Sequence, residues 1–216
     1  MARPEGGYRS KIDQGRLPGS STVASLIKDS GGLIHWAWNE GREGRDYRET
    51  AKSAANAGTL VHEAAEAWKH GLPYEWPAGP PELVEKAQRG YGAFLEWTRQ
   101  TRLKIEQTEV SLVSEVHRYG GTFDALLVGD KRVMADYKTA SAVYPEHLLQ
   151  IVSYQRLWEE NFPDQPIQGG YYILRFSRDH GDFAANWYGD LEDAWTAFLH
   201  CRALYDLKAA LAKRCR

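Results

Sequence analysis

The spacing of apolar positions predicts helices in the first part of the chain. An alanine-rich stretch ends at Gly71 and Pro73, as a helix should, with Gly58-Thr59 as a point at which it would divide in two. The next apolar residues recur at the spacing of one helix face. The helices expected from these and similar patterns are a short one after Ser20-Ser21-Thr22, ETAKSAANAGTLVHEAAEAWKHG, PELVEKAQRGYGAFLEWTRQT, PEHLLQIVSYQRLWEEN with Pro145 near its start, and a last one from Asp190 to about Lys213.

From about residue 106 the pattern changes to that of strands. TEVSLVSEVHRYGGTFDALLVGDKRVMADYK predicts three strands with turns at Gly120-Gly121 and Gly129-Asp130-Lys131. GGYYILRFS and DFAANWY predict a further strand pair. The order of helices, three strands, a helix, two strands and a helix is typical of an α/β or α+β protein in which helices flank a sheet.

Two segments lack such a pattern. Residues 1 to about 20 are polar and rich in Gly, Pro and Arg, so we expect a flexible arm. The charged stretch Asn39–Arg48 carries two glycines and is expected to be a loop. The rest fits a single domain with a helical part at about 21–105, a sheet core at about 106–190 and a C-terminal helix at about 190–214.

Composition and charge narrow the class of protein. The chain has 216 residues, of which 43% are hydrophobic and 26% charged, an ordinary globular mix. It has no apolar run of about 18 residues and no apolar core near its N-terminus, so we expect neither a membrane span nor a secretory signal, and a cytoplasmic protein. Its 27 basic and 29 acidic residues argue against a protein that coats nucleic acid by charge alone. They do not argue against a nuclease, whose site must be acidic to hold metal.

The stretch GTFDALLVGDKRVMADYKTA carries the candidate chemistry. If its turn is residues 129–131, Asp124 faces Asp136 across a hairpin with Cβ atoms about 5 Å apart, and Lys138 projects from the same face. Two carboxylates so placed repel one another unless a cation lies between them, and a hard divalent ion such as Mg²⁺ suits them. The lysine would help to position the attacking water and stabilise the developing phosphorane charge. Alone, Asp136 and Lys138 are as consistent with a solvated strand face.

The D-x-K string has little weight by itself. It occurs at Asp136-Tyr137-Lys138 and at Asp206-Leu207-Lys208, about as often as chance allows. The second string lies in an expected surface helix without an upstream acid, so only the first is a candidate site.

The helices on either side of the hairpin add polar residues. His62 follows Gly58 by one turn, and Glu66 lies one turn further on the same face. Gln150 and Tyr154 are spaced four apart on the helix after the lysine strand. Alone, His62 is typical of a helix end and Tyr154 of a core, whereas a buried amide such as Gln150 needs partners.

Taken in order, G-x-x-x-H, G-T-F-D, D-Y-K-T and Q-x-x-x-Y resemble the RecB-type branch of the PD-(D/E)xK nucleases, over about residues 20 to 175. The resemblance implies a restriction-endonuclease-like α/β core, with a mixed central sheet flanked by helices and an N-terminal helical region. Its implied site residues are the metal ligands His62, Asp124, Asp136 and the backbone carbonyl of Tyr137, the catalytic Lys138, and Gln150 and Tyr154 as support that contacts DNA.

Some positions depart from the family pattern or extend it. Asp136 stands where many members have Glu, and no proline precedes Asp124. Glu115 resembles the acid of the first strand, and a two-residue turn at Gly120-Gly121 would place it opposite Leu126, so it is a secondary ligand candidate. The iron–sulfur members need four cysteines around the core, whereas this chain has two, both C-terminal, so we expect no iron–sulfur cluster.

The predicted function is hydrolysis of DNA with Mg²⁺ or Mn²⁺, by an exonuclease of recombination, repair or phage DNA processing in a bacterial or phage-infected cytoplasm. The expected partner is DNA, joined by a second copy of the chain or a recombination protein, without a membrane. Arg45 and Arg48 would contact phosphates or belong to a solvated loop. The alternatives are a non-catalytic DNA-binding or assembly subunit of the same fold and a site-specific or structure-specific endonuclease.

Overall fold

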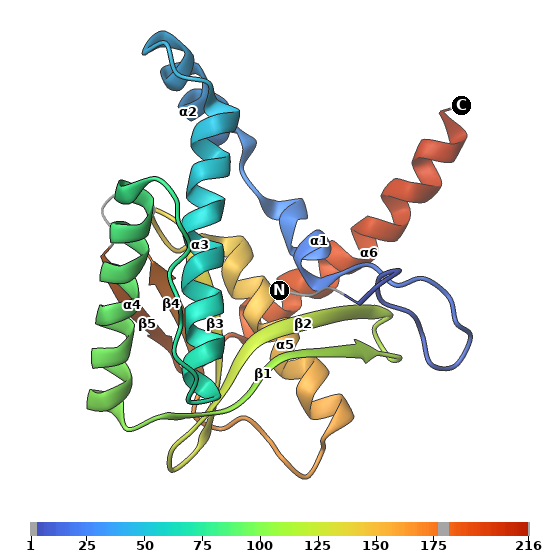
Figure 1. Ribbon diagram of the computed structural model, residues 1–216. Helices are drawn as coiled ribbons and strands as arrows, with labels where there is room; N and C mark the ends of the chain where they lie inside the picture. Colours follow the sequence, from blue (N-terminus) through green and yellow to red (C-terminus); the bar gives the residue numbers. More distant parts are fainter. Residues whose placement is uncertain (1–3, 177–181, 216) are drawn as a thin grey trace.

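The chain forms one mixed sheet covered on both faces by helices (Figure 1). The structure is a computed structural model that describes residues 4–176 and 182–215, without the side chains of residues 30, 33, 52–58, 62, 69 and 209. Its elements are, in chain order, α1 (Ser20–Ala24), the 3-10 helix η1 (Ser25–Ile27), α2 (Ser30–Arg42), α3 (Tyr47–Lys69), α4 (Pro81–Thr101), β1 (Lys104–Ser114), β2 (Tyr119–Val128), β3 (Arg132–Thr139), α5 (Pro145–Asn161), β4 (Tyr171–Phe176), β5 (Phe183–Tyr188) and α6 (Glu192–Arg214).

The five strands lie in the order in which they occur in the chain, β1-β2-β3-β4-β5. Neighbouring strands are antiparallel except β3 and β4, which are parallel and are joined by the crossover helix α5. This arrangement confirms the predicted α/β class with a mixed sheet flanked by helices. None of the described helices is long and apolar enough to cross a lipid bilayer.

Each face of the sheet has its own apolar core, as strand alternation requires. On β3, Met134 belongs to the core under α5, together with Leu126 of β2 and Ile173 of β4. The neighbouring Ala135 and Tyr137 belong to the other core, under α3 and α4. Even-numbered residues of β3 therefore face α5, and this is the side on which Asp136 and Lys138 lie.

The predicted hairpin register is correct. Val128 pairs with Arg132 and Leu126 with Met134, around a turn of residues 129–131 in which the N–H of Gly129 donates to the carbonyl of Lys131. The three-residue turn thus places Asp124 and Asp136 at corresponding positions on the two strands.

The predicted turn at Gly120-Gly121 is wrong, because both glycines lie inside β2 and the turn is residues 115–118. A Cβ on Gly120 would come within 2.3 Å of the Tyr8 ring, and one on Gly121 within 2.7 Å of the Tyr154 ring. The glycines therefore admit aromatic rings from both the N-terminal segment and α5. The positive φ of the turn, 57°, is at Arg118.

The predicted loop at Asn39–Arg48 is mostly helical. Helix α2 continues to Arg42, and α3 begins at Tyr47 after Asp46, whose carboxylate accepts a 2.8 Å hydrogen bond from the Arg48 N–H. Asp46 is thus an N-cap within a charged stretch. Helix α3 also continues through Gly58-Thr59 without a break.

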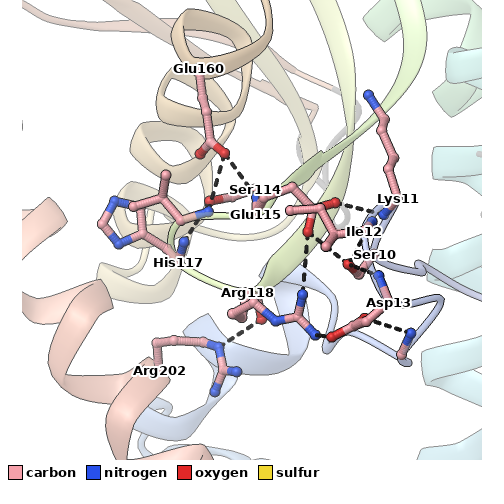
Figure 2. Close-up of polar contacts among 12 residues, drawn as sticks. Ser10, Lys11, Ile12, Asp13, Ser114, Glu115, His117, Arg118, Glu160 and Arg202 are labelled. Atoms are coloured by element: carbon pink, nitrogen blue, oxygen red, sulfur yellow. Dashed lines mark hydrogen bonds and ion pairs between the residues drawn. The ribbon is translucent and has the colours of Figure 1, made fainter.

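The first 20 residues were expected to be a flexible arm, but several residues of the described part, from residue 4 onwards, are packed against the sheet. Tyr8 and Leu17 are buried, and Tyr8 donates to or accepts from Thr122 at 3.0 Å. Glu115 accepts hydrogen bonds from the Ser10 hydroxyl and the Lys11 N–H, and Arg118 pairs with Asp13 (Figure 2). The composition missed this packing because Tyr8 and Leu17 are isolated among polar residues.

Candidate active site

Two buried carboxylates and a lysine meet where β2 and β3 run side by side. Asp124 is 2% exposed and Asp136 is fully buried. Lys138 Nζ lies 2.5 Å from Asp136 Oδ2, and the Lys138 side chain is 14% exposed. The ammonium group of Lys138 thus contacts a buried acid, on the face of the sheet where strand alternation predicts Lys138.

The local backbone explains how Asp124 is held. Ladder pairing between β2 and β3 ends at Ala125 and Ala135, and the next inward-pointing N–H of β3, that of Tyr137, donates to Asp124 Oδ2 at 2.7 Å. The carboxylate takes the place of a strand carbonyl. Because the N–H and C=O of one strand residue point to the same side, the carbonyl of Tyr137 also faces β2. It is on the correct edge for the predicted backbone ligand.

Burial dominates the protonation of the pair. It raises the pKa of Asp124 to about 6, although Lys138 and the Tyr137 N–H lower it. Burial raises the pKa of Asp136 to about 7, with Lys138 acting against the shift and Asp124 adding to it. The two acids are therefore poorly stabilised as a pair of anions by the described protein groups alone.

The pair has the chemistry of a site for a hard divalent ion. Within the described residues, Asp124 Oδ1 and both oxygens of Asp136 are buried and accept no geometrically regular hydrogen bond, although Lys138 forms an ion pair with Asp136. The described residues hold no cluster of three or more His, Cys, Asp or Glu side chains with metal-site geometry. One or two carboxylates are, however, what Mg²⁺ usually takes from a protein, with water and substrate phosphate as the other ligands.

Gln150 and Tyr154 come together on α5, as their spacing predicts. The Gln150 amide donates to the Tyr154 hydroxyl at 2.5 Å. Burial raises the pKa of Tyr154 well above its usual range, and the charges of Asp136 and Asp124 add to the shift. Tyr154 is only 3% exposed, so it is a buried residue of α5. Of the two residues, only Gln150 keeps a side chain that is partly accessible to solvent.

His62 lies on α3, but its side chain is outside the described part of the structure. The neighbouring Val61 and Ala65 pack in the core that contains Tyr137, on the face opposite Asp136. His62 as a metal ligand therefore stays a prediction.

Glu115 does not lie opposite Leu126, which pairs with Gln107. Glu115 is the first residue of the turn that follows Ser114. It therefore lies beyond the end of the β1–β2 ladder, where Ser114 pairs with Tyr119. Its carboxylate accepts from Ser10 and Lys11 and pairs with Arg118 (Figure 2). These contacts make it a residue that fastens the N-terminal segment, not one that adjoins the acid pair.

Arg45 and Arg48 lie at the junction of α2 and α3, which projects beyond the sheet (Figure 1). Arg45 makes two 2.8 Å hydrogen bonds to Glu40 and also pairs with Glu43. Arg48 stacks over the Tyr47 ring at 4.8 Å. Arg45 is therefore committed to neighbouring acids, and phosphate contact by either arginine remains a prediction.

The residue that sequence reasoning missed is Glu109 of β1. Val110 pairs with Phe123 and Thr108 with Ala125, so Glu109 lies across from Asp124. Its φ of 53° is strained for a strand residue, and its charge contributes to the raised pKa of Asp124. The register of β1 could have revealed it, but that register depends on a bulge between Ile105 and Gln107.

No protein-family model and no curated protein matches the sequence. Among solved structures, a candidate exonuclease from Eubacterium rectale is similar with a TM-score of 0.49 and 11% identity, over 67% of this chain and 64% of its own. The chain thus spans less than two thirds of that relative. The alkaline exonuclease LHK-Exo from Laribacter hongkongensis is similar with a TM-score of 0.36 and 12% identity, over 92% of this chain and 94% of its own.

Proposed function

We propose that the protein is a nuclease that hydrolyses DNA phosphodiester bonds with the help of Mg²⁺ or Mn²⁺. The observation that supports this most is the buried Asp124 and Asp136 pair beside Lys138, on one face of a sheet. A structural ion pair would need one acid for one lysine. A second buried acid beside them raises the free energy of the folded protein unless a further cation is bound.

In this proposal Asp124 and Asp136 hold the ion, with the Tyr137 carbonyl and His62 as further ligands. A bound divalent ion supplies Lewis-acid polarisation of the phosphate and a more acidic water. The Tyr137 N–H fixes Asp124 through Oδ2 and leaves Oδ1 for the ion. Lys138 Nζ, next to Asp136, can donate a hydrogen bond to the attacking water or to a phosphate oxygen.

Within this class we favour an exonuclease that acts on DNA ends in recombination, repair or phage DNA processing, because the family resemblance implies it. The resemblance rests on four short motifs that occur in order. The hydrogen bond from the Tyr137 N–H to Asp124 and the contact of Lys138 with Asp136 support the proposal for two of these motifs.

The test is digestion of linear duplex, linear single-stranded and closed circular DNA, with Mg²⁺, with Mn²⁺ and with EDTA. Lys138→Ala is compared with Lys208→Ala, which changes the lysine of the second D-x-K string, on the exposed side of α6. We expect loss of linear DNA only with a divalent ion, by the wild type and Lys208→Ala but not by Lys138→Ala.

The other outcomes separate the alternatives. Cleavage of circles that Lys138→Ala abolishes would retain the site and identify an endonuclease. DNA binding without turnover in every metal would replace the enzyme by a binding subunit. Equal turnover by wild type and Lys138→Ala would overturn the assignment of the site.

A further inference from the structure

Arg175 of β4 lies directly beside Lys138 in the sheet. The two residues are in register across the parallel β3–β4 pair, where neighbouring strands are about 4.8 Å apart. Ile173, two residues earlier on β4, packs in the core under α5, so Arg175 projects from the same face as Lys138. A second cation therefore borders the candidate active site.

The guanidinium group is held at the end of β3. Its NH1 donates to the carbonyl of Ala140 at 3.3 Å, and its NH2 to Asp182 Oδ2 at 2.9 Å. The Arg175 side chain is 15% exposed, whereas that of Asp182 is 54% exposed. These two bonds to described residues fix the direction of the guanidinium and use two of its five N–H donors.

Two cations at adjacent positions of a sheet repel one another, and they favour an anion placed across both. His147 of α5, another basic residue near Lys138, does not contribute positive charge. Burial lowers its pKa to about 3, with Lys138 and Lys28 adding to the shift, and its Nδ1 accepts from the Tyr144 N–H at 3.2 Å. Arg175 is thus the permanent charge beside the catalytic lysine.

We propose that Arg175 binds a phosphate group of the nucleic-acid strand, next to the bond that is cleaved. The proposal rests on the proposed nuclease function and names a substrate-binding residue for it. A planar guanidinium can donate two parallel hydrogen bonds to one phosphate, which a lysine cannot do. With Lys138 at the reacting phosphate, Arg175 would fix the neighbouring phosphate and so align the strand over Asp124 and Asp136.

The test measures DNA affinity and turnover of Arg175→Gln and Arg175→Lys. Fluorescence anisotropy of a short labelled duplex, in Ca²⁺ and over a series of salt concentrations, gives the affinity, with a gel to check that the DNA stays intact. The matched control is Arg132→Gln, because Arg132 lies at the opposite end of β3 and makes two hydrogen bonds to Glu106. Thermal unfolding is followed for every variant.

We expect Arg175→Gln to weaken DNA binding roughly 5- to 50-fold, with a salt dependence smaller by about one phosphate contact. Arg175→Lys should keep the salt dependence and recover part of the affinity. Arg132→Gln should bind DNA as the wild type does even where its Tm is lower. Asp182→Asn should bind at least as tightly as the wild type, because it removes an acid that competes with phosphate.

Wild-type DNA affinity in Arg175→Gln would overturn the proposal, and an equal fall in Tm for Arg175→Gln and Asp182→Asn would then identify a purely structural ion pair. The nuclease function fails separately. A wild type without metal-dependent turnover would overturn that function, while weaker binding by Arg175→Gln would still support phosphate contact. A wild type that neither binds nor cleaves DNA would overturn both proposals.

Discussion

The backbone N–H of Tyr137 donates a 2.7 Å hydrogen bond to the carboxylate of Asp124, which lies on the neighbouring strand. The bond ties the acid of β2 to the backbone between Asp136 and Lys138. It also uses only one oxygen of Asp124. An amide at this position would keep the bond and lose the charge, which makes Asp124→Asn an informative variant.

Asp124→Asn is expected to lower metal-dependent turnover by more than about 100-fold, since it weakens an ion ligand rather than a group that merely supports one. In EDTA at pH 8 the same variant should have a higher Tm than the wild type, because it removes one of two buried like charges. Asp130→Asn, in the exposed turn between β2 and β3, is the control and should change neither quantity. A lower Tm together with full turnover in Asp124→Asn would contradict the assignment.

The stability of the metal-free protein should depend on pH in a defined direction. The pKa values of Asp124 and Asp136 are raised from 3.8 in the unfolded chain to about 6 and about 7 in the folded protein. Between pH 3.8 and about 7 the folded state therefore binds more protons than the unfolded state. The free energy of unfolding contributed by the pair is therefore present below about pH 4 and is lost as pH rises to about 7. Urea unfolding in EDTA at pH 5 and pH 8 measures the change.

Mg²⁺ should restore stability at pH 8, where both acids are charged, and have little effect at pH 5. Asp136→Asn should flatten the pH dependence and remove most of the Mg²⁺ effect. Equal stabilisation by Mg²⁺ in the wild type and in Asp136→Asn would place the ion elsewhere.

Gly121→Ala should destabilise the protein by about 1–3 kcal/mol, as expected for overpacking. The new Cβ would lie 2.7 Å from the Tyr154 ring and 2.9 Å from Leu157, both on the helix behind the acid pair. Turnover should fall as well, because the Tyr154 ring shifts. Gly92→Ala in α4 is the matched control, since a Cβ there meets nothing within 4 Å. It should stabilise the protein by about 0.5–1 kcal/mol, so that chemical unfolding of the two variants gives opposite signs.

Glu115→Gln is expected to lower Tm at neutral pH and leave turnover per folded molecule unchanged. Hydrogen bonds from Ser10 and Lys11, with the charge of Arg118, lower the pKa of Glu115. Its stabilising contribution is therefore present at neutral pH and is lost as pH falls through the lowered pKa. Loss of turnover with an unchanged Tm would return Glu115 to the candidate ligands. Activity assays beside thermal unfolding at pH 7 and pH 3 decide between the two roles.

The acid pair and lysine were predictable because a three-residue turn fixes the register of one hairpin, and strand alternation then places Asp124, Asp136 and Lys138. Both the turn and strand alternation depend only on residues that are close together in the sequence. Gln150 and Tyr154 follow from helical spacing in the same way. The site could therefore be predicted wherever one local element sets the geometry.

The errors arose where distant segments decide the structure. Gly120 and Gly121 have the composition of a turn, but they serve close approach of Tyr8 and Tyr154. The role of Glu109 depends on a bulge in β1. The N-terminal segment has the composition of an arm, and its order comes from contacts with β2 and the turn before it. None of these contacts leaves a periodic pattern in the sequence.

The hydrogen bond between Tyr8 and Thr122 joins residues 114 positions apart, and this affects the order of folding. During synthesis the N-terminal segment leaves the ribosome before β2 and α5, which carry the residues that it contacts. Until β2 has been made, the segment cannot form its native contacts. Contacts between residues so far apart in the chain slow folding. A segment that is made before its partners is therefore expected to reach its native position only after β2 has formed.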